Sequence, residues 1–145
     1  MPADLVAYDR SGSIRVLVEV KNKPVTSATW ARDLRRNVLA HGLRPRADYF
    51  VVATPTMVHV WKEPADSTAM PSVSVDALAL WERYSGGRAL GPGSGEAFEL
   101  VVASWLTDVA LRWPAIRQDS EMRRLEGTGL PDAIRGGRVE HGVAA

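Results

Sequence analysis

Two strand-like segments near the N-terminus, joined by a short turn, constrain the fold more than any other feature of the sequence. In residues 14–21 every second position is a valine or isoleucine, which places a uniform row of side chains on one face of a strand. Residues 4–8 form a shorter, mainly apolar stretch, and Gly12 between them can adopt the positive φ of a tight turn. Pro24 has no N–H for a sheet ladder and closes the second strand. The pattern predicts a β-hairpin.

A helix is predicted directly after the hairpin. Trp30, Leu34 and Val38 recur every four residues, which is the spacing of one helical face. Gly42 stands where a helix-ending glycine is common. We therefore expect a helix over residues 28–41 that packs this face against a sheet.

The rest of the chain alternates between strand and helix patterns and predicts a mixed α/β fold. A Tyr-Phe-Val-Val run favours a buried strand, and the strand that follows it is expected to be more exposed. The expected elements, in chain order, are a buried strand over 48–53, a more exposed strand over 57–61, a loop over 62–72, a short helix over 76–84, a glycine-rich linker over 85–95, a long helix that Ser94 caps and Pro114 ends, a short helix over 130–135 and a poor edge strand over 139–143.

Size and composition indicate one soluble domain. A chain of 145 residues, 46% of them apolar, can bury a core of its own. It has no cysteine, which excludes disulfides and thiolate ligands, and no apolar run reaches the ~18 residues of a membrane span. We see no signal peptide and expect a cytoplasmic protein without a membrane partner. Within the domain we expect a core over 1–61, its helical completion over 62–113 and a weakly structured tail over 114–145.

Basic charge gathers in the first third of the chain. Residues 1–46 hold nine lysines and arginines against four acids, whereas the remainder holds nine against thirteen. The resulting local net charge of +5 suits a polyanionic partner. A solvated surface of mixed charge is an equally good interpretation.

Three charged side chains are predicted to converge at one end of the hairpin. Asp4 opens the first strand, while Glu19 and Lys21 share a face at the end of the second. Two neighbouring carboxylates repel each other, and they stay ionised together most easily when a cation lies between them. Oxygen ligands favour Mg²⁺ or Mn²⁺, and a nearby lysine can orient a water or stabilise a phosphoryl transition state. These residue types suit phosphodiester hydrolysis.

The stretch Pro2-Ala3-Asp4, followed by Val18-Glu19-Val20-Lys21, resembles the signature of the PD-(D/E)XK nuclease superfamily. The helix and buried strand expected next follow the family's order, so the resemblance covers about residues 2–53. It implies a restriction-endonuclease-like core, which is a small mixed sheet flanked by helices. It also implies that Asp4, Glu19 and the Val20 carbonyl bind the metal and that Lys21 is the catalytic lysine.

The chain departs from the family pattern at its start. Ala3 separates Pro2 from Asp4, and the family's first helix and strand have no counterpart in the three residues before Asp4. Either these elements are missing or the chain begins inside a longer gene. Glu96 and Glu99 would replace the acid of that first helix only if their own helix reaches the sheet edge; otherwise they offset its dipole.

Outside the motif, Arg32, Arg35 and Arg36 on the predicted helix are the candidates for contacting nucleic-acid phosphates. They also fit an ordinary solvated helix face. His41 is placed to cap the C-terminus of that helix. His59 and Trp61 are expected at the surface of the exposed strand, in contrast to the tryptophans at core spacing, which are Trp30, Trp81 and Trp105.

The sequence therefore predicts a Mg²⁺-dependent endo- or exonuclease that hydrolyses phosphodiester bonds of DNA or RNA. Two alternatives stay open. A catalytically inactive module would keep the fold to bind nucleic acid or protein, and it would not bind Mg²⁺. A homodimer would complete the short core by covering the sheet edge that the absent strand leaves.

Overall fold

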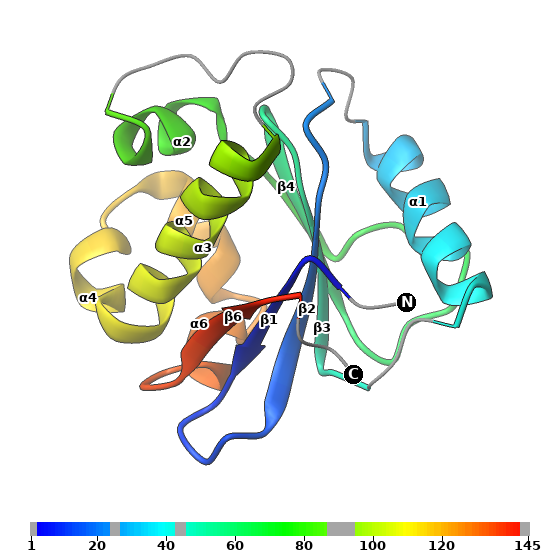
Figure 1. Ribbon diagram of the computed structural model, residues 1–145, viewed down its shortest axis with the longest axis horizontal. Helices are drawn as coiled ribbons and strands as arrows, with labels where there is room; N and C mark the ends of the chain where they lie inside the picture. The colour runs from blue at the N-terminus through cyan, green and yellow to red at the C-terminus, as the bar shows by residue number, and fades with distance from the viewer. Residues whose placement is uncertain (1–2, 24–26, 43–45, 87–94, 143–145) are drawn as a thin grey trace.

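The computed structural model describes residues 3–23, 27–42, 46–86 and 95–142, which form a mixed α/β fold in three layers (Figure 1). A six-stranded mixed sheet is the middle layer. Helix α1 covers one face of this sheet, and the helices that follow it in the chain cover the other (Figure 1). The predicted class, a mixed sheet flanked by helices, is confirmed.

The strands are β1 (Leu5–Tyr8), β2 (Ile14–Val20), β3 (Tyr49–Ala53), β4 (Met57–Lys62), β5 (Val73–Asp76) and β6 (Arg138–His141). Their spatial order is β5-β4-β3-β2-β1-β6. Strands β2 and β3 pair in parallel, while the other described neighbours pair antiparallel. Parallel neighbours need a crossover connection, and α1 supplies it.

The helices are α1 (Ala28–Ala40), α2 (Leu78–Tyr84), α3 (Gly95–Leu111), α4 (Trp113–Ile116), α5 (Ser120–Glu126) and α6 (Leu130–Ala133). Ser27 caps α1, because its side chain accepts a hydrogen bond from the Trp30 N–H at 3.1 Å. Gly42 follows α1 with a φ of 78°, as a helix-ending glycine should. His41 is the C-terminal capping residue, as predicted.

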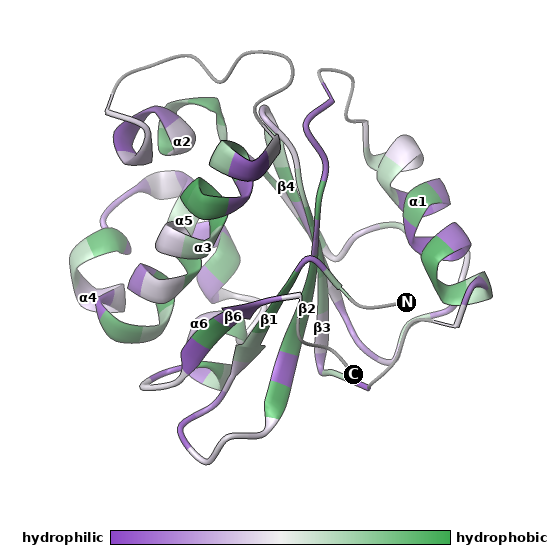
Figure 2. Ribbon diagram, viewed as in Figure 1, coloured by the Kyte–Doolittle hydropathy of each residue, from purple (hydrophilic) through white to green (hydrophobic). Residues whose placement is uncertain are grey.

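Each face of the sheet carries its own apolar core, so the central strands are apolar on both sides (Figure 2). The larger core lies between the sheet and helices α2 to α6. In it, the ring of Trp81 packs edge-on against Phe98 and Trp105, with centroids 5.7 and 5.4 Å apart. The smaller core lies under α1 and includes Leu17 and Phe50.

The structure confirms the predicted hairpin, the helix over 28–41 and the buried strand over 48–53. It also confirms a short helix and an edge strand near the C-terminus, as α6 and β6. The long helix is present as α3, but it ends at Leu111, and Pro114 lies in the first turn of α4 instead. Ser94 and most of the expected linker over 85–95 lie outside the described residues.

Two predictions about exposure and order are wrong. Strand β4 is not exposed, because β3 and β5 flank it and each face is covered, so that His59 and Trp61 are both buried. The described part of the segment after residue 114 is well structured, because α5 and α6 place Met122, Leu125 and Leu130 in the larger core. Strand β5 and helix α5 were not predicted at all.

Strand β6 occupies the outer edge of β1, where the family resemblance leaves a strand missing. It pairs antiparallel with all of β1, from Leu5 opposite His141 to Tyr8 opposite Arg138. Gly137 makes this approach possible, because a Cβ at that position would lie 1.7 Å from the Tyr8 carbonyl oxygen. In this structure the described chain itself covers the edge that a homodimer would cover in the alternative left open by the sequence. None of the described helices combines the length and apolarity needed to cross a bilayer.

Gly137→Ala is expected to displace β6 from β1, because the new methyl group would meet a backbone oxygen that cannot rotate away. We predict a loss of at least about 2 kcal/mol in the free energy of unfolding, measured by urea denaturation. Gly127→Ala is the matched control, since its Cβ would find its nearest neighbour at 3.7 Å. Equal stability of the two variants would contradict the proposed close approach.

Candidate active site

The register of the hairpin brings Asp4 and Glu19 to opposite positions. Leu5 pairs with Val18, so Asp4 and Glu19 face each other one step further along the ladder. Leu17, two residues before Glu19, lies in the core under α1, and side chains two residues apart share a face. Both carboxylates are therefore on the face that α1 covers.

The backbone hydrogen bonds show how closely this pair approaches. The Gly142 N–H donates to the Asp4 carbonyl at 2.8 Å, so the backbone groups of Asp4 point toward β6. The Lys21 N–H donates to the Ala53 carbonyl at 2.9 Å, so those of Lys21, and of Glu19 two residues earlier, point toward β3. Asp4 and Glu19 thus form a non-hydrogen-bonded pair, the arrangement in which facing side chains lie closest.

The side chain of Asp4 ends the ladder in place of a backbone group. Its Oδ2 accepts a hydrogen bond from the Val20 N–H at 2.8 Å. In an extended strand the N–H and C=O of one residue point to the same side, so the Val20 carbonyl is also directed toward Asp4. The fold therefore brings together the three groups that the motif predicts as metal ligands.

Glu19 is the least satisfied charged group of the site. Its side chain is only 3% exposed, and its Oε1 is buried without a hydrogen-bond partner in the described structure. Burial, followed by the charge and the hydrogen bond of Asp4, raises the pKa of Glu19 to about 7, and the charge of Lys21 opposes this rise. Near neutral pH the pair therefore holds a proton that a cation can replace.

The residues present fit a divalent cation. Asp4 is partly exposed and gives access to the pair, while the buried Oε1 of Glu19 accepts no hydrogen bond from the described residues. Among the described residues, no cluster of three or more His, Cys, Asp or Glu side chains is placed to hold a metal. This site offers two carboxylates and one carbonyl. That number of ligands suits Mg²⁺, which keeps several positions for water or phosphate oxygens.

Lys21 directly follows β2, two residues after Glu19, so the two side chains lie on the same face of the sheet. Lys21 is partly exposed. Its positive charge lowers the pKa of Glu19, which shows that the two groups are electrostatically coupled. Lys21 therefore lies near enough to the carboxylate pair to influence the charge of Glu19.

The prediction that Arg35 contacts nucleic acid is not compatible with its position. Arg35 is 1% exposed, and its Nε and Nη2 donate to both oxygens of Glu63 at 3.0 and 2.9 Å. Its remaining hydrogen bonds go to the carbonyls of Asp66 and Ala65, and its guanidinium lies 5.6 Å from the centroid of the Trp61 ring. The charge of Arg35 is used to fix the loop after β4 against α1.

Arg32 and Arg36 remain candidates for a nucleic-acid surface. Both lie on α1 with part of their side chains exposed, and both form ion pairs with Asp33, at 3.1 and 3.5 Å. Exposed ion pairs of this kind are weak, so a phosphate can compete for either arginine.

Sequence reasoning missed a buried polar pair on the same face of the sheet. His59 lies opposite Val52, which lies opposite Glu19, so His59 is two strands away from the carboxylate pair in the same row. Its Nδ1 is 2.7 Å from the hydroxyl oxygen of Ser74 on β5. The sequence predicted an exposed His59, because the elements that bury it are distant in sequence.

Glu99 does not join the carboxylate pair. Its helix α3 does reach the sheet edge, where the Oε2 of Glu99 lies 2.8 Å from the Nδ1 of His141 on β6. His141 pairs with Leu5, whose side chain belongs to the larger core on the opposite face from Asp4 and Glu19. Glu96, at the start of α3, is exposed and suits the helix dipole.

Comparisons with known proteins add no identification, since no family model, curated protein or solved structure matches this chain. The chemistry of the site is therefore inferred from its residues and their geometry.

Glu19 is expected to make the stability of the protein depend on pH when no divalent cation is present. The pKa of Glu19 in the folded state is about 7, higher than the usual value of 4.5. Its contribution to the free energy of unfolding is therefore fully present below pH ~4.5 and is lost as the pH rises through 7. The free energy of unfolding of the wild type should fall as the pH rises, and Glu19→Gln should remove roughly 2–3 kcal/mol of this fall. Urea denaturation in EDTA from pH 5 to 8.5 measures it.

Glu82→Gln is the matched control, because Glu82 is exposed on α2. It should leave the pH dependence of the wild type unchanged. A wild-type stability that stays flat over this range would contradict the burial of an ionisable Glu19.

Proposed function

We propose that this chain is a Mg²⁺-dependent nuclease that hydrolyses phosphodiester bonds of DNA or RNA. The observation that carries the proposal is the orphaned, buried carboxylate oxygen of Glu19 directly across the hairpin from Asp4. A buried charge without a partner costs stability, so a site that retains one is a candidate for function. A divalent cation between the two carboxylates would supply the missing partner.

The fold around the pair supports a restriction-endonuclease-like core. Strand β2 carries Glu19 and Lys21 near its end, α1 crosses over, and β3 returns parallel to β2. This is the order of elements that the motif resemblance implies for residues 2–53. Strand β6 pairs where the resemblance leaves a strand missing, so that β1 lies inside the sheet.

Each residue of the site has a defined part in the proposed reaction. Asp4, Glu19 and the Val20 carbonyl would hold the cation, which supplies Lewis-acid activation of the phosphate and of a water. Lys21 would orient the attacking water and stabilise negative charge that develops on the phosphoryl oxygens. Arg32 and Arg36, exposed on α1, would contact phosphates away from the bond that is cut.

A second candidate function is a catalytically inactive module that keeps this fold to bind nucleic acid or protein. It is favoured by the burial of Glu19, which is 3% exposed, and by the absence of a third acidic or histidine ligand near the pair among the described residues. In such a module Asp4 and Glu19 would share a proton near neutral pH, and no cation would be needed.

The catalytic assignment of Lys21 is tested by cleavage of labelled single-stranded DNA, double-stranded DNA and RNA in Mg²⁺ or Mn²⁺. We predict that Lys21→Ala lowers the cleavage rate at least about 100-fold, as loss of a group that stabilises the transition state does. Because Lys21 is partly exposed, the variant should keep the thermal stability of the wild type.

Lys23→Ala is the control, since Lys23 is exposed two residues further along the chain. It should cleave at nearly the wild-type rate. Cleavage by Lys21→Ala at the wild-type rate would refute the role of Lys21, and a wild-type protein that cleaves none of the substrates would favour the inactive module.

A further inference from the structure

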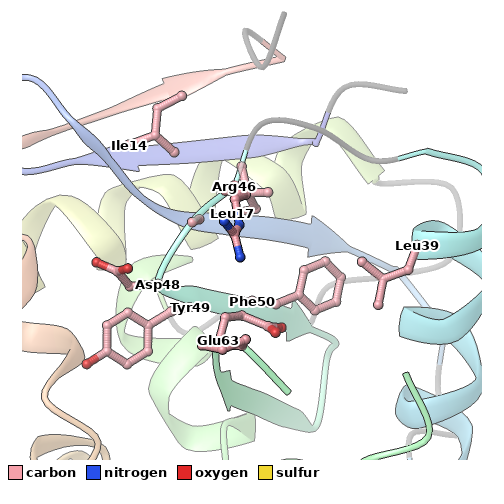
Figure 3. Close-up of a pocket in the computed structure, with 10 residues that line it drawn as sticks. Ile14, Leu17, Leu39, Arg46, Asp48, Tyr49, Phe50 and Glu63 are labelled. Carbon is pink, nitrogen blue, oxygen red and sulfur yellow. The ribbon is translucent and has the colours of Figure 1, made fainter. Parts of the chain in front are cut away.

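A concave site lies on the α1 face of the sheet, toward the start of β2, whereas the carboxylate pair lies near the end of that strand. It is a hollow of about 590 Å³ at the start of β2 and β3 (Figure 3). Leu17 and Phe50 face each other across the β2–β3 ladder there, and Leu39 contributes from the last turn of α1. A volume of this size accommodates a small organic molecule.

Each acidic residue that lines the hollow has an arginine partner. Glu63 binds Arg35 through both of its oxygens, at 2.9 and 3.0 Å. Asp48 forms an ion pair with Arg15, which also pairs with Asp9. The hollow therefore offers no unpaired carboxylate among the described residues that line it.

Arg46 is the charged lining residue that has no such partner. It precedes β3, and its guanidinium extends over the space bounded by Leu17, Phe50 and Glu63 (Figure 3). Within the described part of the chain Arg46 forms no ion pair, whereas the neighbouring Arg15 and Arg35 each do. A hollow with apolar side chains in its wall and a cation without an ion-pair partner at its rim is complementary to an amphipathic anion.

We propose that this hollow binds a small organic acid, with the apolar body against Leu17, Leu39 and Phe50 and the anionic group on Arg46. Neither Asp4 nor Glu19 lines the hollow. The ligand class follows from the lining, because apolar side chains form much of the wall and Arg46 is the lining charge without an ion-pair partner among the described residues. A neutral ligand would leave Arg46 without a partner, and a cationic one would be repelled.

The test uses a charged and a neutral probe with the same ring system, 1-naphthoate and 1-naphthalenemethanol. Each is titrated into the full chain, and the backbone amide shifts of Leu39, Ala47 and Phe50 are followed by NMR. We expect saturable shifts at these amides and an affinity for 1-naphthoate at least about fivefold higher than for the alcohol. Arg46→Gln should bring the two affinities together, and Leu39→Glu should weaken 1-naphthoate binding most.

Arg36→Gln is the matched control, because Arg36 is an exposed arginine of α1 that does not line the hollow. It should keep the preference for the charged probe. Equal affinity for the two probes in the wild type, shifts that do not saturate at these amides, or an unchanged preference in Arg46→Gln would each overturn the proposal. None of these results depends on whether the chain cleaves nucleic acid.

Discussion

The antiparallel pairing of β1 with β2 determines both the centre of the sheet and the position of the two carboxylates. Because Leu5 is opposite Val18, Asp4 and Glu19 have to meet at the next step of the ladder, on the face that α1 covers. A slip of one residue would move Glu19 to the other face and separate it from Asp4. The hydrogen bond from the Val20 N–H to the Asp4 side chain strengthens this register at the end of the strand. Fold and candidate chemistry therefore depend on the same contact.

Two charged side chains buried under the same layer illustrate different outcomes of burial. Arg35 is surrounded by acceptors, with Glu63 and two backbone carbonyls binding its guanidinium, and its burial stabilises the loop after β4. Glu19 has an oxygen without a partner and a like charge beside it, so burial raises its pKa instead. Structural ion pairs are normally satisfied in the way that Arg35 is. Glu19 is therefore the residue of this pair that a bound proton or cation would stabilise.

Local patterns in the sequence predicted the elements around the site, because each depends on a short stretch of chain. The alternation in 14–21 and the spacing of Trp30, Leu34 and Val38 were sufficient for the hairpin and α1. Long-range contacts were not predictable in this way. The burial of His59 and Trp61 depends on β5, on the loop after β4 and on Arg35, and the order of the C-terminal segment depends on packing against α3. The burial of Arg35 was not predictable either, because its partner Glu63 is distant in sequence.

The central claim is that Asp4 and Glu19 hold a divalent cation, and calorimetric titration of Mn²⁺ and Mg²⁺ into the protein tests it most directly. At pH 6.5, below the pKa of about 7 for Glu19, we predict saturable binding of one ion per chain, with release of a proton from Glu19 that makes the measured enthalpy depend on the buffer. An Asp4→Asn/Glu19→Gln double variant should fold normally and lose this binding. No binding to the wild type, or equal binding to the double variant, would contradict the claim and leave Asp4 and Glu19 as a pair that shares a proton.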